Sequence, residues 1–292
     1  MRVSRPLERT RGALAVSAVL MIAAAALVAC APSQQPVAGA QSEQSVDADE
    51  PAPPAGLESI DFGDLDWTLR PGGSVPETVQ VELVDGKASD GMVSYELGEV
   101  VLAELTDDDR MDAAVQITRL DGNAIDEQWY LWVATDQGPV QVTLPVARMA
   151  RCGTVTHSVT AVEGGVEIHE TRRSVADQSI PCSDLGSDER TRTVAAVEAR
   201  NAGEWWPVQT APIGGFGGLC PMTTHLDTYE NEGALYPVPD ATATEPIAFD
   251  GRSTVFEIEG WPVYGEPFPG WVLTGVQHGD DRGCAWAEVP GS

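Results

Sequence analysis

The sequence predicts a mainly β protein with two small β-rich domains, an N-terminal antiparallel sheet or sandwich and a C-terminal small barrel. Short runs rich in Val, Thr and aromatic residues recur along the chain between Gly, Asp and Asn residues, which is typical of strands joined by turns. Long stretches with the period of an amphipathic helix are scarce. A glycine-rich stretch at 214–218 separates residues 57–210 from residues 219–292, and we expect a domain boundary there.

The first domain, residues 57–210, contains seven clear strand patterns, which alternate apolar and polar residues or are rich in β-branched residues. They are Val79–Val84, Val93–Leu105, Ala113–Leu120, Gln128–Thr135, Pro139–Leu144, Thr154–Val162 and Gly165–Arg172. The last two are separated by a short turn with Gly164, which predicts a β-hairpin.

Residues 188–209 allow two interpretations. Thr191–Arg200 and Glu204–Gln209, separated by Asn201-Ala202-Gly203, fit a second hairpin, because Thr and Val alternate with polar residues. The alternative is a short helix over 188–200 that starts after Ser187 and ends near Gly203. The alternation favours the hairpin.

The second domain, residues 219–292, is rich in Gly, Pro and Trp. Its strand patterns are short and evenly spaced, which indicates a small barrel. They are Ala234–Val238, Ile247–Phe249, Thr254–Glu259, Trp271–Val276 and Cys284–Val289.

The N-terminus has the pattern of an export signal. Several arginines precede Gly12–Val28, an apolar run of 17 residues, which is short for a membrane-spanning helix of about 20. The run ends in Leu27-Val28-Ala29-Cys30, which resembles the signal of bacterial lipoproteins. That resemblance implies removal of residues 1–29 and lipidation of Cys30, which would anchor the protein to the extracytoplasmic face of the cell membrane. An ordinary signal peptide and an uncleaved anchor are the alternatives.

Residues 30–56 are expected to be a flexible tether. Pro, Ala, Gln, Ser and acidic residues dominate this segment, and it contains no aromatic residue. Such a composition buries too little apolar surface to offset the entropy of ordering. As a coil, the segment would have a root-mean-square reach of roughly 28 Å.

The net charge of −28 restricts the possible partners. Removal of residues 1–29, with four arginines and one glutamate, would make the charge more negative by three. Such a charge repels nucleic acid phosphates and anionic lipids, so nucleic acid is not an expected partner. Lys87 is the only lysine among 17 basic residues, which indicates a GC-rich genome and fits an actinobacterium.

Four cysteines follow Cys30, an even number that predicts two disulfides in an exported protein. Sequential pairing, Cys152–Cys182 and Cys220–Cys284, would place one bridge in each half of the chain. The two other connectivities stay open at this stage. A zinc site of four cysteines would need closer pairs than these.

Three segments resemble the actinobacterial secreted lipoproteins of the LppP/LprE-like group over about residues 90–205. Leu97–Val115 is similar to a recurrent hairpin with an acidic turn in that group. Cys182-Ser183, and Thr191 through Val208 with its Trp-Trp-Pro, are similar to the group's later part. The resemblance implies location and fold, and it carries no activity.

The acidic turn also resembles the cation-binding loops of FG-GAP and VCBS repeats. Calcium takes about six to eight oxygen ligands, and alternate residues of such a loop supply them. Two loop glycines of the pattern are replaced by Asp107 and Asp109, which tolerate a positive φ better than most residues. The alternative is a solvated acidic turn without metal. The resemblance implies a weak calcium site with side-chain oxygens from Glu104, Thr106, Asp108 and Asp112 and the carbonyl of Arg110.

Residues 234–289 distantly resemble a bacterial SH3-type barrel. The similarity lies in the opening Ala234–Asp240, the turn Phe249-Asp250-Gly251, and the later pairs Gly270-Trp271 and Cys284–Trp286. The resemblance implies binding of cell-wall peptide or glycan.

The sequence gives no motif for catalysis. The nucleophile elbow of hydrolases, the H-E-x-x-H zinc motif and the Walker phosphate loop do not occur. His157 and His169 fall on strands of one hairpin and are expected to approach each other, as surface or packing residues. Trp205 and Trp206 are adjacent, so in a strand they face opposite sides.

The sequence therefore predicts a lipid-anchored extracytoplasmic lipoprotein that is a non-enzymatic binding or accessory module for other envelope proteins. The alternative is a lipoprotein that binds cell-wall glycan or peptide through residues 219–292. A cofactor is not expected, apart from weakly bound calcium.

Overall fold

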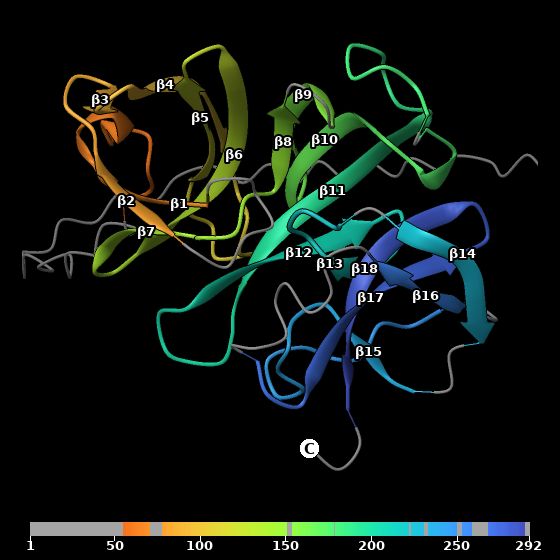
Figure 1. Ribbon diagram of the computed structural model, residues 1–292. Coiled ribbons are helices and arrows are strands. Elements are labelled where there is room, and N and C mark those ends of the chain that lie inside the picture. Colours follow the sequence, from red (N-terminus) through yellow and green to blue (C-terminus); the bar gives the residue numbers. More distant parts are fainter. Residues whose placement is uncertain are drawn as a thin grey trace, which may run out of the picture. The chain divides into compact units, whose positions relative to one another are not determined.

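The computed structural model describes residues 55–70, 78–150, 154–177, 179–221, 223–230, 233–249, 253–258 and 268–289 (Figure 1). The regular structure in these residues is strand, apart from two short 3-10 turns, η1 (Phe62–Asp64) and η2 (Val175–Asp177). The mainly β prediction is confirmed. Most of the expected signal and tether, with Cys30, lies outside the described residues.

The first sheet contains six antiparallel strands in the order β3-β4-β5-β6-β7, with β8 also paired to β6. Before it in sequence, β1 and β2 form a separate two-stranded sheet. The strands are β1 (Asp66–Leu69), β2 (Val79–Glu82), β3 (Lys87–Asp90), β4 (Val93–Ala103), β5 (Asp112–Asp121), β6 (Ala124–Thr135), β7 (Gly138–Gln141) and β8 (Ala147–Ala150).

The second sheet is a five-stranded antiparallel meander in the order β13-β12-β11-β10-β9. The predicted hairpin β9–β10 is confirmed, and so is the hairpin β11–β12, because residues 188–198 form a strand rather than a helix. The strands are β9 (Val155–Val162), β10 (Gly165–Arg172), β11 (Asp188–Glu198), β12 (Trp205–Ala211) and β13 (Gly215–Phe216).

The third sheet is not the closed barrel that the sequence predicted. Its order is β14-β16-β17-β18-β15, so within the described residues β14 and β15 are two unjoined edges. Closure of a barrel requires pairing between the two edge strands. Here β15 has two residues, both paired with β18, and Ile247–Phe249 forms no strand. The strands are β14 (Thr223–Glu230), β15 (Leu235–Tyr236), β16 (Thr254–Ile258), β17 (Trp271–His278) and β18 (Asp281–Glu288).

Strand β6 belongs to two hydrophobic cores at once. Side chains alternate along a strand, so Leu131 and Val133 face one way and Tyr130 and Trp132 face the other. Leu131 and Val133 pack in a core with residues of the second sheet, including Ile168. On the opposite face, Tyr130 and Trp132 form a core with residues of β1, β2 and η1. Both faces of β6 are therefore buried over Gln128–Ala134.

A third core joins residues on both sides of the 214–218 stretch. Trp206 of β12 lies 6.1 Å from Trp286 of β18, ring centroid to ring centroid, in an edge-to-face arrangement. The disulfide Cys220–Cys284 borders the same core and confirms that pairing. The division into domains 57–210 and 219–292 stays a prediction, with this core shared between them.

Cys182 is disulfide-bonded, whereas its expected partner Cys152 lies outside the described residues. The Cys152–Cys182 pairing therefore stays a prediction. Among the described residues, no helix has the length and the apolar character that crossing a membrane requires.

Leu131→Ala tests the role of β6. Leu131 is fully buried, so we expect the substitution to lower the free energy of unfolding by about 2–5 kcal/mol through lost burial and a cavity. The control is Ile125→Ala on the same strand, where Ile125 is 48% exposed and the expected loss is below about 1 kcal/mol. Urea unfolding of both variants measures the difference. Equal losses would contradict the packing of Leu131 in the core with the second sheet.

Candidate functional site

The acidic turn between β4 and β5 has the backbone that the sequence suggested. Asp107 and Asp109 have φ angles of 59° and 62°, in the left-handed region that glycine normally occupies. Glu104 Oε1 accepts hydrogen bonds from the backbone N–H groups of Thr106, at 3.2 Å, and Asp108, at 3.1 Å. The turn is therefore held by its own side chains.

Asp112 lies buried at the start of β5 and ties the turn to β6. Its carboxylate accepts hydrogen bonds from the N–H of Leu105 at 3.0 Å and the N–H of Ala134 at 2.7 Å, and from the hydroxyl of Thr106 at 3.3 Å. Burial raises the pKa of Asp112, and these backbone hydrogen bonds oppose the rise. Both of its oxygens are thus occupied.

Arg110 supplies positive charge inside the turn. Its guanidinium lies 2.7 Å from Asp108 and 3.0 Å from Asp136. Burial alone would raise the pKa of Asp108 slightly, but the hydrogen bonds and charge of Arg110 lower it. In the described part of the chain, no three His, Cys, Asp or Glu side chains are grouped to hold a metal ion. Calcium binding by Glu104, Thr106 and the other expected ligands stays a prediction.

Calcium binding at the turn requires Asp108 to leave Arg110. If the site exists, calcium at ten times its Kd raises the free energy of unfolding by roughly 1.4 kcal/mol. We expect a larger calcium effect in Arg110→Gln and none in Asp108→Asn. The measurement is thermal unfolding with calcium chloride against a chelator at matched ionic strength, because the acidic chain responds to any salt. A shift that is absent, or equal in Asp108→Asn, would mean that the turn binds no calcium.

The two histidines of the β9–β10 hairpin lie together, as expected. The rings of His157 and His169 are 4.6 Å apart, centroid to centroid. His157 Nε2 contacts the Thr171 hydroxyl at 2.7 Å, and His169 Nε2 contacts Glu189 of β11 at 2.9 Å. Both rings are thus occupied by polar partners on the sheet.

Trp205 and Trp206 face opposite sides of β12, as expected. Trp206 is 2% exposed and belongs to the core shared with the third sheet. Trp205 is half-buried and packs against the core between the first and second sheets.

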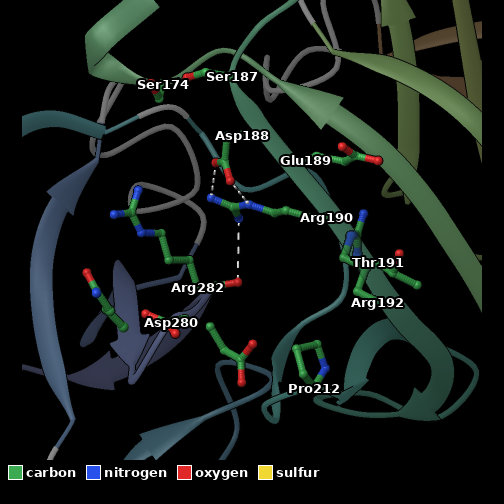
Figure 2. A pocket seen from close by; sticks show the side chains of 12 residues that line it. Ser174, Ser187, Asp188, Glu189, Arg190, Thr191, Arg192, Pro212, Asp280 and Arg282 are labelled. Atoms are coloured by element: carbon green, nitrogen blue, oxygen red, sulfur yellow. Dashed lines mark hydrogen bonds and ion pairs between the residues drawn. The ribbon is translucent and has the colours of Figure 1, made fainter.

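A polar pocket of about 400 Å³ lies between β11 and the β17–β18 turn (Figure 2). This pocket was not predicted from the sequence. Its walls carry both signs of charge, because Arg190 and Arg192 come from β11 while Asp280, Asp281 and Arg282 come from the turn and β18. Such a site suits a polar, charged ligand better than an apolar one.

Asp188 and Arg190 form an ion pair on the wall of this pocket (Figure 2). Residues two apart on a strand lie on one face. The Arg190 guanidinium bonds both carboxylate oxygens of Asp188, with Nε at 2.9 Å from Oδ1, and its third nitrogen points at the carbonyl of Arg282, 3.5 Å away. A two-point contact of this kind fixes both side chains.

A second ion pair, between Glu170 of β10 and the wall residue Arg192 of β11, is buried. Arg192 Nε lies 3.1 Å from Glu170 Oε1, and the two side chains are 6% and 1% exposed. Arg192 also donates to the carbonyl of Gly217, at 2.8 Å, and to the carbonyl of Val146. Burial alone would raise the pKa of Glu170, but the charges of Arg192 and Arg172 lower it.

Asp177 of η2 holds the segment that closes one side of the pocket. Its Oδ2 accepts hydrogen bonds from the backbone N–H and the hydroxyl of Ser174, at 2.8 and 3.0 Å, and from the same two groups of Ser187, both at 2.9 Å. The backbone hydrogen bonds from Ser174 and Ser187 lower the pKa of Asp177 to about 2. At neutral pH the carboxylate is charged and keeps the two serines in place.

The sequence contained one signal for this pocket. Four of the 17 basic residues lie between positions 172 and 192, in a chain with a net charge of −28. That clustering was visible, but the approach of Arg282, which is 90 residues further along the chain, was not.

Comparison of the chain with protein-family models, with curated proteins and with solved structures finds no match.

Glu170→Gln tests the buried pair. The substitution leaves the Arg192 charge buried without its partner, so we expect a loss of about 3–5 kcal/mol in the free energy of unfolding at neutral pH. The folded-state pKa of Glu170 lies below its ordinary value of 4.5. The stabilisation that the charged Glu170 contributes is therefore present above about pH 4.5 and is lost as the pH falls through the folded-state pKa of Glu170.

The pH dependence adds a second readout to the same test. Urea unfolding from about pH 7 to pH 3 is expected to show a shallower acid loss in Glu170→Gln than in the unmodified protein. Glu189→Gln is the matched control, because Glu189 is exposed and its one ion pair among the described residues is with His169. Identical pH profiles for the two variants would contradict the assignment.

Proposed function

We propose that this protein is a lipid-anchored extracytoplasmic binding module that presents its polar pocket to a charged segment of another envelope protein. The pocket between β11 and the β17–β18 turn is the observation that supports this proposal. It is large enough for a few residues of a partner, and its walls are fixed by ion pairs before any partner arrives. A site that needs little ordering loses less entropy on binding.

Binding fits this pocket better than catalysis. A general acid or base needs a carboxyl or imidazole group that exchanges protons near neutral pH. Asp188 is held by two contacts to Arg190, and Asp177 is held charged by four hydrogen bonds. Asp188 is therefore already engaged by Arg190, and Asp177 supports the segment beside the pocket instead of lining it.

The expected anchor fits the same function. Lipidation at Cys30 with a tether over residues 30–56 would keep the folded part within roughly 28 Å of the membrane. A second acyl chain makes such an anchor stable. At that distance the pocket meets membrane-bound partners at a high effective concentration.

The second candidate function is binding of cell-wall glycan through residues 219–292. A pocket of about 270 Å³ lies between Arg200, Asp240, Phe268 and Trp271. Trp271 is half-buried and packs edge-on against Tyr236, with 5.4 Å between ring centroids. The Arg200 guanidinium lies 4.3 Å above the Phe268 ring. Aromatic rings with polar neighbours are suited to sugar rings.

Photo-crosslinking in cells separates the two functions. A photo-crosslinking residue replaces Gln277 on the pocket wall, and in the control it replaces Gln80, which is exposed on β2. We expect one discrete protein adduct from position 277, none from position 80, and loss of the adduct when Cys30→Ser removes the anchor. Detergent-phase partitioning checks the anchor itself.

The opposite result would support the wall function. If position 277 gives no adduct while the protein sediments with purified peptidoglycan, and Trp271→Ala abolishes that sedimentation, the accessory role is wrong.

A further inference from the structure

A small cavity with an unusual charge shares wall residues with the polar pocket. This cavity, of about 20 Å³, has side chains of Arg172, Arg173, Arg190 and Arg282 on its walls, and we call it the arginine niche. It shares Ser174, Asp188, Arg190 and Arg282 with the larger pocket, so the two spaces adjoin. Its volume is close to that of a single water-sized group.

The niche concentrates positive charge in an acidic protein. Four arginines and one carboxylate residue, Asp188, are among its lining residues, although the whole chain carries a net charge of −28; the rest of the lining, which includes Pro221 and Phe256, is uncharged. Asp188 is already bound at two points by Arg190. Arg173 is also occupied, because it donates to the carbonyls of Ile180, Pro181 and Asp184.

Arg172 and Arg282 remain available to a ligand. Arg172 stands opposite Asp188 in the β10–β11 register, yet within the described residues its guanidinium donates no hydrogen bond to an acceptor. Arg282 is exposed at the mouth of the niche, and its guanidinium likewise has no hydrogen-bond acceptor in the described part of the chain. Each guanidinium carries five N–H donors.

Burial and neighbouring charges make Arg172 favourable for anion binding. Burial, together with the charges of Arg190 and Arg192, lowers the pKa of Arg172 to about 10, although the charges of Glu170 and Asp188 oppose this. A half-buried cation with like charges beside it is stabilised by an added anion. A carboxylate fits the guanidinium group well, since its two oxygens match two parallel N–H donors.

The outer pocket selects what else the ligand carries. Glu189, Asp280 and Asp281 line the larger pocket and are absent from the lining of the niche. They would repel a ligand with several negative charges and attract a cation a few ångströms from the carboxylate. The arrangement therefore complements a ligand with one carboxylate inside and a basic group outside.

We propose that the arginine niche binds the free terminal carboxylate of a peptide, with Arg172 and Arg282 as donors, while a basic residue just before the terminus lies beside Asp280 and Asp281. This inference rests on the proposed binding function of the pocket and names the chemistry of its ligand. Two sources share that chemistry, the C-terminus of a partner protein and a peptide of the cell wall. They differ in the configuration of the last residue.

Titration calorimetry with short peptides tests the proposal on the detergent-solubilised full-length protein. The probes are Gly-Lys-Ala with a free L-Ala carboxylate, the same peptide with D-Ala, and the L-peptide as its amide. We expect one of the free acids to bind at least about tenfold more tightly than the amide, a difference of about 1.4 kcal/mol. A preference for L-Ala indicates a protein terminus, and a preference for D-Ala indicates a wall peptide. Equal affinity of acid and amide overturns the proposal.

Variants assign the two donors. Arg172→Gln and Arg282→Gln are each expected to weaken binding of the free acid at least about tenfold and to leave binding of the amide unchanged. Arg119→Gln is the control, since it removes the same charge from β5, where Arg119 pairs with Asp121 at 2.7 Å. If Arg172→Gln fails to fold, the exposed Arg282 decides the question, and unchanged affinity in Arg282→Gln overturns the proposal.

The two proposals fail in different ways. A discrete adduct from position 277 together with equal binding of acid and amide would retain the partner function and reject the carboxylate. Selective binding of the acid without any adduct would retain the carboxylate and reject the membrane partner.

Discussion

The buried ion pair between Glu170 and Arg192 is the contact on which the centre of the structure depends. Two charges without water cost free energy unless each is paired and hydrogen-bonded. Arg192 meets this condition by donating to Glu170 and to the carbonyls of Val146 and Gly217. Val146 precedes the last strand of the first sheet, and Gly217 follows β13 of the second sheet. One side chain therefore ties together three segments that are distant in sequence.

The same pair determines how β10 and β11 present their other charges. Asp188, Arg190 and Arg192 alternate along β11, so they lie on one face, opposite Arg172, Glu170 and Ile168 of β10 in turn. Because Arg192 takes Glu170, Arg190 pairs with Asp188 on its own strand, and Arg172 is left without a hydrogen-bonded carboxylate in the described residues. The free donors of the niche are thus a consequence of charge pairing inside the sheet.

The sequence predicted the local elements of this architecture well, because alternation and turn residues are local signals. The β9–β10 and β11–β12 hairpins and the positive φ at Asp107 follow from residues close in sequence. The cysteine count predicted two disulfides and left their pairing open, and the structure shows Cys220 paired with Cys284. The expected barrel was wrong, because barrel closure depends on the pairing of edge strands, which are distant in sequence, although β15 itself lies within the predicted strand Ala234–Val238. The pocket was missed because Arg190 of the second sheet and Arg282 of the third sheet, which are distant in sequence, come together only in the folded chain.

The distribution of charge explains how an acidic protein can still select an anionic group. Long-range repulsion from a net charge of −28 acts on the total charge of a ligand, whereas contact with the niche acts on one group of it. A polyanion is repelled by the whole net charge, and it gains little from contact with the niche, because the niche has a volume of about 20 Å³. A ligand with one carboxylate and one cation is neutral overall and avoids the repulsion. The acidic surface and the small niche therefore both disfavour a polyanion, and the niche alone favours a single carboxylate.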